Sequence, residues 1–182
     1  MRRSTWTTLS LLTTVCVVAA AAVRGAGRPS KPGPELQRLA FYIGDWAYTE
    51  DYERSVLFPE GGHNTGSWTA QWGPRSLSVV HTFATNGTAD PYSGMEIMVW
   101  DSAGRVYRDH AIWFDTAGQW EFTGRFEGEA LVYHGAFLYQ GKQVDFRSET
   151  RPRPGGGFTL DEYARVNGGP EQKILRGTAV PQ

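Results

Sequence analysis

The stretch LQRLAFYIGDWAYTEDY (residues 36–52) changes its periodicity in the middle. Its first half places Leu36, Leu39, Ala40 and Ile43 at helical spacing. Gly44 follows at the position where a helix commonly ends, and the residues after it are aromatic and alternating, as in a strand. The stretch therefore predicts a short helix that passes directly into a β-strand.

Short segments rich in aromatic and β-branched residues continue to the end of the chain, separated by turns that contain glycine, such as TNGTADPYSG, DSAG, YQGK and NGGP. This pattern predicts about ten strands. They fall at residues 46–52, 66–72, 77–84, 95–100, 105–114, 120–126, 131–139, 143–150, 158–166 and 173–180. The loops have hairpin length, and an open sheet of this size would leave its edges exposed. We therefore expect an all-β fold, a single closed antiparallel up-and-down barrel with a short N-terminal helix.

The first residues have the layout of a secretory signal peptide. Arg2 and Arg3 precede an apolar run at residues 11–23 that ends in small residues. We expect a signal peptide at residues 1–25, a Gly/Pro linker at 26–33 and the barrel domain at 34–182. An uncleaved anchor is the alternative. Cleavage would remove Cys16, leave no stable membrane span, and deliver a cysteine-free protein to the periplasm or the medium.

The composition argues against nucleic acid as a partner. The net charge is −1, with acids and bases interspersed and no basic stripe. The chain contains 7 Trp, 8 Tyr and 9 Phe, which is many for its length. Such residues either fill a β core or line an apolar cavity.

Alternation predicts which side chains point inward. Trp120, Phe122 and Phe126 alternate with polar residues, and a tight turn near Gly128 carries the same face to Tyr133. The same argument leads from Phe158 and Leu160 to Glu162, and groups Leu77, Val79, His81 and Phe83 on one face. If Glu162 is buried, its carboxylate must be paired or protonated, with Arg176 or Arg108 as a possible partner.

The segment 105–114 is ambiguous, because the face that points inward depends on the length of the loop DTAG. One face holds Val106, Arg108, His110, Ile112 and Phe114. The other holds Tyr107, Asp109, Ala111 and Trp113, and we favour this second set as the inner one.

The motif Gly44-Asp45-Trp46 after a short helix resembles the start of lipocalins and of the wider calycin group. The order of LAFYIGDW, SGMEIMVWD, GRVYRDHAIWFD, FTGRF and FTLDEY is similar to that of a bacterial family with a lipocalin-like domain of unknown function, over most of residues 36–180. This resemblance implies that Trp46 packs at the closed end of the barrel and that a late arginine, Arg176, covers it. The chain is also distantly similar to nitrobindin-type barrels, whose haem-ligating histidine lies late in the chain. No histidine follows His134 here, so we expect no cofactor.

The sequence has no metal-binding spacing of histidines, no nucleophile motif and no phosphate loop. Asp109 and His110 are neighbours on one strand and therefore point to opposite faces. We expect a barrel, monomeric or homodimeric, that binds a small hydrophobic or amphipathic molecule without metal or catalysis. The residues expected to line its site are Trp46, His81, Tyr107, Asp109, Trp113, Trp120, Phe122, Tyr133, Glu162 and Arg176. The alternatives are an isomerase or hydrolase that uses His81, Glu162 or Asp109, and an interaction module with a filled barrel.

Overall fold

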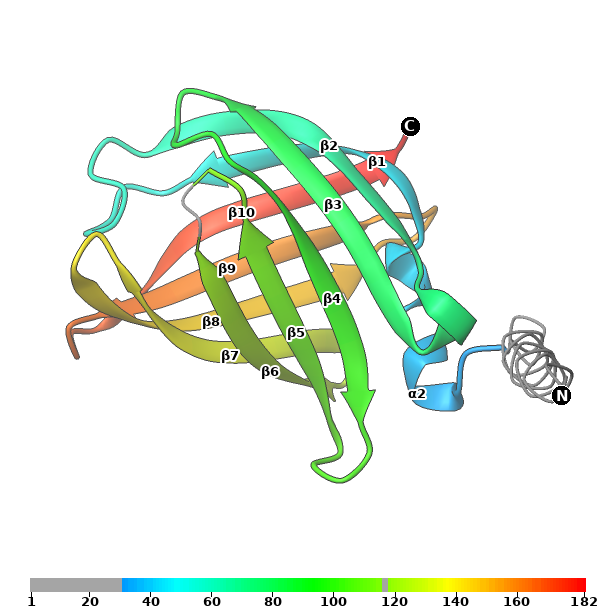
Figure 1. Cartoon of the computed structure of the whole chain (residues 1–182). Coiled ribbons are helices and arrows are strands. Elements are labelled where there is room, and N and C mark those ends of the chain that lie inside the picture. The colour runs from blue at the N-terminus through cyan, green and yellow to red at the C-terminus, as the bar shows by residue number, and fades with distance from the viewer. Residues whose placement is uncertain (1–30, 116–117) are drawn as a thin grey trace, which may run out of the picture.

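The structure, a computed structural model, describes residues 31–115 and 118–182 and forms a closed antiparallel barrel (Figure 1). In the described residues, ten strands follow one another around the barrel, and β1 closes it by pairing with β10. This architecture confirms the expected all-β up-and-down barrel. The expected signal peptide and most of the expected linker lie outside the described residues.

All the expected strands are present, most with ends one to four residues away from their sequence-based limits. They are β1 (Gly44–Tyr52), β2 (Gly62–Trp72), β3 (Ser78–Gly87), β4 (Ser93–Asp101), β5 (Val106–Trp113), β6 (Gln119–Glu127), β7 (Ala130–Tyr139), β8 (Lys142–Pro152), β9 (Phe158–Val166) and β10 (Glu171–Pro181). Every strand pairs with its sequence neighbours in antiparallel register.

The N-terminal helical segment is shorter and tighter than expected. It consists of α2 (Pro34–Gln37) and a 3₁₀ turn, η1 (Ala40–Tyr42). The buried residues are Leu36, Leu39 and Tyr42, which recur every three positions as in a 3₁₀ helix, whereas Ala40 is only partly buried. This segment covers one end of the barrel (Figure 1), where the Tyr107 hydroxyl donates to the Glu35 carbonyl oxygen at 2.8 Å.

Leu77 does not share the face of Val79, His81 and Phe83, with which it was expected to alternate. A second 3₁₀ turn, η2 (Pro74–Ser76), precedes β3, and Arg75 and Ser76 have positive φ angles of 58° and 54°. The turn delays the start of β3 to Ser78, so the strand alternation does not reach Leu77, which is 61% exposed. Val79 and the residues that alternate with it do point inward.

The structure resolves the ambiguous segment in favour of the second set. Tyr107, Asp109 and Ala111 are buried, and Ala111 lies opposite Trp120 across β5 and β6. A four-residue loop DTAG would pair Trp113 with Trp120. The observed register differs from that pairing by two residues, which preserves the face because side chains alternate with a period of two.

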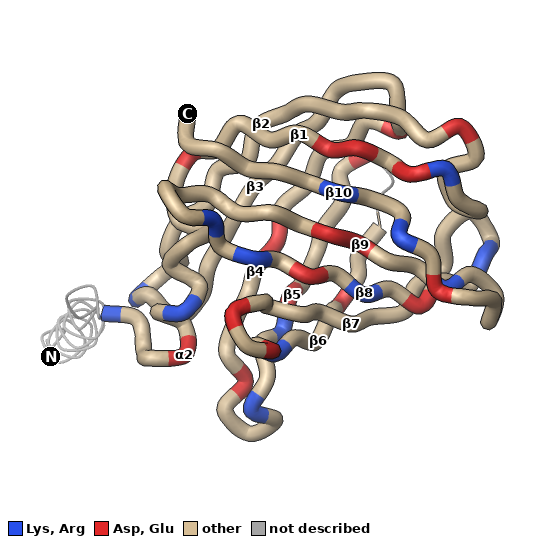
Figure 2. The backbone as a smooth tube through the Cα atoms, turned by 180° about the vertical axis from the view of Figure 1, so that it is seen from behind, with Lys and Arg blue, Asp and Glu red and all other residues tan. Residues whose placement is uncertain are grey.

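Charged residues of both signs are interspersed along β8, β9 and β10 (Figure 2). Arg147 lies between Glu149 and Glu171, and its guanidinium stacks on the Tyr163 ring at 3.8 Å. Within the described ranges, no helix is long and apolar enough to cross a membrane.

Candidate functional site

The interior of the barrel contains a cavity of about 280 Å³. One end is covered by α2 and η1, and the residues on the cavity wall extend to the opposite end, where the exposed Asp90 and Asp115 contribute to it. The barrel is therefore not filled by its own side chains, and it has a closed end and a mouth.

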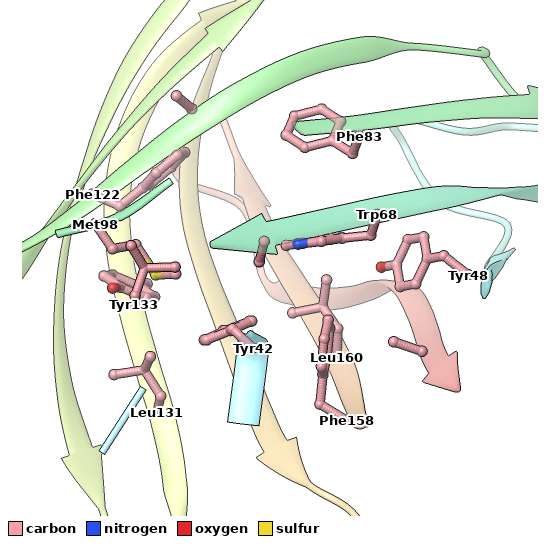
Figure 3. Packing of buried hydrophobic residues seen from close by; sticks show 14 of the residues in the cluster. Tyr42, Tyr48, Trp68, Phe83, Met98, Phe122, Leu131, Tyr133, Phe158 and Leu160 are labelled. Atoms are coloured by element: carbon pink, nitrogen blue, oxygen red, sulfur yellow. The ribbon is translucent and has the colours of Figure 1, made fainter. Parts of the chain in front are cut away.

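Aromatic rings from many strands point toward one another around this space (Figure 3). On one wall Trp120 stacks on Phe137 with ring centroids 4.2 Å apart, and Trp113 lies 5.1 Å from Trp120. Phe122 and Phe146 continue this wall at 5.3 Å. Such rings offer a large apolar contact surface that loses little conformational entropy when a ligand binds.

Three ionisable side chains meet on the wall formed by β3, β4 and β5. His81 lies directly opposite Glu96 in the strand register, and Asp109 projects from the next strand. The potential ligand atoms of His81, Glu96 and Asp109 all lie within 4.8 Å of one another. His81 is 1% exposed and its ring stacks on Trp68 at 4.6 Å.

The polar atoms of this cluster are poorly satisfied. His81 Nε2 lies 2.9 Å from Glu96 Oε2, but the contact is not directed along a ring N–H bond, and neither ring nitrogen has a hydrogen bond. Asp109 Oδ1 and the Tyr133 hydroxyl also lack partners among the described residues. Burial, followed by the charge of Glu96, raises the pKa of Asp109 well above its usual range. A buried carboxylate without a hydrogen-bond partner or a cation is costly, so the unpaired Asp109 oxygen destabilises this part of the interior.

A second acidic group lies across the barrel on β1 and β9. Glu162 lines the cavity, and burial followed by the charges of Glu50 and Glu96 raises its pKa well above its usual range. Glu50 is 1% exposed and accepts hydrogen bonds from the hydroxyls of Tyr52, at 3.1 Å, and Tyr92. Burial raises the pKa of Glu50 to about 7, against the opposing effect of these hydrogen bonds.

The described residues that line the cavity include Asp90, Glu96, Asp109, Asp115 and Glu162 but no lysine or arginine. The potential partners that we considered for Glu162 are both outside. Arg108 contacts Asp101 at 3.3 Å and Glu121 at 3.2 Å, and Arg176 contacts Asp161 at 3.3 Å. The cavity is therefore aromatic and acidic, with His81 as the one basic side chain among its described lining residues.

The structure brings seven of the ten sequence-predicted residues together on the cavity wall. They are His81, Asp109, Trp113, Trp120, Phe122, Tyr133 and Glu162. Trp46 and Tyr107 are buried but lie at the closed end, beneath the cavity. There, Trp46 Nε1 donates to the Tyr42 carbonyl oxygen at 2.7 Å.

Arg176 lies on the outer face and does not cover Trp46. A bulge in β10 between Lys173 and Leu175 turns both Ile174 and Leu175 toward the cavity, and the next residue, Arg176, then points to solvent. In the register of β1 and β10, Arg176 is opposite Asp51, whereas Trp46 is opposite Pro181.

Sequence reasoning missed Glu96, Tyr42, Glu50 and Tyr92. The apolar alternation of β4 favours Met95, Ile97 and Val99 as inward residues, but the strand presents its other face to the cavity. The register with β5 contains the missing signal. Trp100 lies opposite Tyr107, so an inward Tyr107 also directs Glu96 inward.

A closed ten-stranded meander with a helical cover at one end and a central cavity defines a calycin-like barrel. Comparison with known proteins agrees at the level of the fold. The structure is similar to that of Rv2717c from M. tuberculosis, with a TM-score of 0.60 and 16% sequence identity, over 84% of this chain and 99% of that chain. It is also similar to the S-type phycobiliprotein lyase CPES from Guillardia theta, with a TM-score of 0.51 and 9% identity, over 81% of this chain and 90% of that chain. No protein-family model and no curated protein sequence matches the chain.

Proposed function

We propose that this protein is an exported barrel that binds a small amphipathic molecule in its interior. The observation that carries the proposal is the cavity of about 280 Å³, walled by aromatic rings and lined by carboxylic acids but by no described lysine or arginine. Ligand pockets in proteins usually measure about 300–1,000 Å³, so the ligand is small.

The walls indicate how such a molecule would lie. Its apolar part would contact Trp113, Trp120 and Phe122, where burial of apolar surface contributes about 25 cal/mol per Å² before the costs of association. Its polar part would donate hydrogen bonds or carry positive charge, because Glu162 and Asp109 are among the carboxylic acids on the cavity wall. The fold similarity to the two barrels named above supports this use of the interior without identifying the molecule.

Binding is tested with N-phenylnaphthylamine, a neutral apolar probe whose fluorescence rises in apolar surroundings. We expect the wild-type protein to bind it in a saturable manner. Ser148 is buried and lines the cavity, so Ser148→Leu should fill part of the space and weaken binding. If the added leucine side chain costs the bound probe about 1.4 kcal/mol, the affinity of the variant for the probe falls tenfold.

The matched control is Ser67→Leu, the same substitution on the exposed outer face of β2. It should bind the probe like the wild type. Equal loss of binding in both variants, or no saturable binding by the wild type, would refute an interior ligand site.

Export is tested separately by expressing the whole chain in a bacterium, separating the cell fractions, and measuring the molecular mass of the protein in each fraction by mass spectrometry. The proposal predicts a periplasmic or secreted protein cut after Ala22 or Gly25 in the signal-peptide-like segment. An intact chain in the membrane fraction would instead indicate an uncleaved anchor.

A further inference from the structure

The cluster of His81, Glu96 and Asp109 has a feature that an apolar ligand does not explain. It places two carboxylates and an imidazole on one wall of a largely aromatic cavity, with potential ligand atoms within 4.8 Å of one another. We propose that this cluster is a site for one divalent first-row transition-metal ion, such as Zn²⁺, held by one atom of each side chain.

The strand register holds the three side chains together. His81 and Glu96 are directly opposite across β3 and β4, and Asp109 follows on β5, beside Glu96 on the diagonal. All three point inward from adjacent strands of a closed sheet, whose hydrogen bonds fix their relative positions. A metal at about 2.0–2.2 Å from each ligand needs only a modest closing of the side chains, which rotation about their own bonds can supply.

The unpaired atoms of the cluster point to a missing partner. Asp109 is 6% exposed, it lines the cavity, and its Oδ1 has no hydrogen bond; both ring nitrogens of His81 are in the same condition. A proton on Asp109 would remove a charge but would leave the imidazole unsatisfied. A metal ion neutralises both carboxylates and also takes a lone pair from one ring nitrogen of the imidazole, so it contacts the three groups together.

The ligand set also indicates the kind of ion. One nitrogen and two carboxylate oxygens suit Zn²⁺ and its first-row neighbours, whereas Ca²⁺ usually takes six to eight oxygens. With three protein ligands, at least one coordination position remains open toward the cavity. The exposed Asp90 and Asp115 at the mouth, and a wall without lysine or arginine, favour the approach of a cation.

The proposal is tested on the full chain after removal of metal with EDTA, by adding Zn²⁺ or Co²⁺ alone. We expect calorimetry with Zn²⁺ to show one ion per chain. Co²⁺ should give the visible absorption bands of a low-coordinate site with nitrogen and oxygen ligands. A lack of saturable binding of both ions would overturn the proposal.

The site is located by isosteric variants. Asp109→Asn and Glu96→Gln should each weaken Zn²⁺ binding by at least about tenfold, because loss of outer-sphere support alone typically costs 10–100-fold. The control is His110→Ala, since His110 is on the outer face of β5, 3.9 Å from Glu121, and offers a competing histidine–carboxylate pair. Unchanged binding in Asp109→Asn, or lost binding in His110→Ala, would place the ion elsewhere and overturn the assignment.

Thermal melting separates a ligand role from a folding role. Asp109→Asn removes an unpaired buried carboxylate, so the metal-free variant should melt at or above the wild-type temperature. Zn²⁺ should raise the melting temperature of the wild type and of His110→Ala but not that of Asp109→Asn. Equal stabilisation of all three proteins by Zn²⁺ would contradict the site. Probe binding by the metal-free protein reports on the organic ligand separately, so the two proposals can fail independently.

Discussion

Glu50 shows at the residue scale how burial sets the charge state of this barrel. Its carboxylate is 1% exposed on β1, yet no cation reaches it among the described residues. The hydroxyls of Tyr52 and Tyr92 donate to it, which offsets part of the cost of burying a charge. Burial still prevails and raises its pKa to about 7, so the residue changes charge near neutral pH.

This shift predicts that the protein loses stability as the pH rises from about 4.5 to about 7. In this range the folded state binds more protons at Glu50 than the unfolded state does, so the free energy of unfolding falls with increasing pH. The stabilising contribution is complete below the unfolded pKa and is lost as the pH passes through the folded pKa. The difference between 4.5 and about 7 corresponds to about 3 kcal/mol at most.

Urea unfolding over this pH range checks the prediction. Glu50→Gln should flatten the pH dependence and be more stable than the wild type above neutral pH. Part of the slope should remain, since the pKa values of Asp109 and Glu162 are raised as well. The exposed Glu53→Gln, three residues further on, should retain the wild-type slope. A wild-type slope in Glu50→Gln would show that Glu50 is already ionised in the folded protein at low pH.

At the scale of the elements, ring-over-glycine pairs between neighbouring strands shape the cavity wall. Gly124 of β6 is directly opposite Tyr133 of β7, and a Cβ at Gly124 would lie 2.5 Å from Tyr133 Cδ1. The same arrangement places Phe122 against Gly135, where a Cβ would lie 2.4 Å from the Phe122 ring. The absent side chains leave room for the rings to lie close against the sheet.

Gly124→Ala should therefore destabilise the barrel by about 1–3 kcal/mol, the usual cost of overpacking a core. The added methyl group would also push the Tyr133 ring into the cavity and reduce the space for a ligand. Denaturant unfolding measures the first effect and probe binding the second. Gly33→Ala is the control, because a Cβ there meets nothing within 4 Å and its φ of −59° suits alanine. Equal stability of both variants and the wild type would mean that Tyr133 can move without cost.

The elements also show which parts of the structure the sequence could predict. Glycine-bearing turns and alternating aromatic residues located all the strands, since both signals are local. The alternation did not predict which face of β4 points inward, because the outer face carries Met95, Ile97 and Val99 and is the more apolar one in sequence. The outward direction of the Arg176 side chain was not predicted either, because it depends on a bulge in β10 that only the pairing with β9 reveals. Register and bulges are properties of strand pairs, and single-strand patterns do not contain them.

At the scale of the whole molecule, the two faces of the sheet differ in how their carboxylates are paired. Basic and acidic residues are interspersed along β8, β9 and β10 (Figure 2). Ion pairs such as that of Lys173 with Asp161 lie outside the cavity. Inside, the described cavity wall has five carboxylate residues and no lysine or arginine. The inner carboxylates therefore lack the lysine and arginine partners that the outer ones have, and a positively charged ligand would supply such a partner.

This asymmetry predicts that the metal-free protein discriminates between ligands by charge. Naphthylmethylamine and naphthoic acid share an aromatic ring system and differ mainly in the sign of their charge near neutral pH. We expect the amine to bind at least about tenfold more tightly by calorimetry, since like charges placed together in a buried site cost several kcal/mol. The aromatic wall contributes equally to both, so the difference reports on the carboxylates.

Glu162→Gln should narrow the gap between the two ligands, because it removes a cavity carboxylate that has no ion-pair partner among the described residues while conserving the shape of the side chain. Glu149→Gln is the outer-face control, since Glu149 is held by Arg147 and Arg151 and does not line the cavity, so the preference for the amine should persist. Tighter binding of the acid would mean that the inner carboxylates are protonated and donate hydrogen bonds to anions. Because the raised pKa of Glu162 favours its protonated form, this outcome would contradict an interior selective for cations.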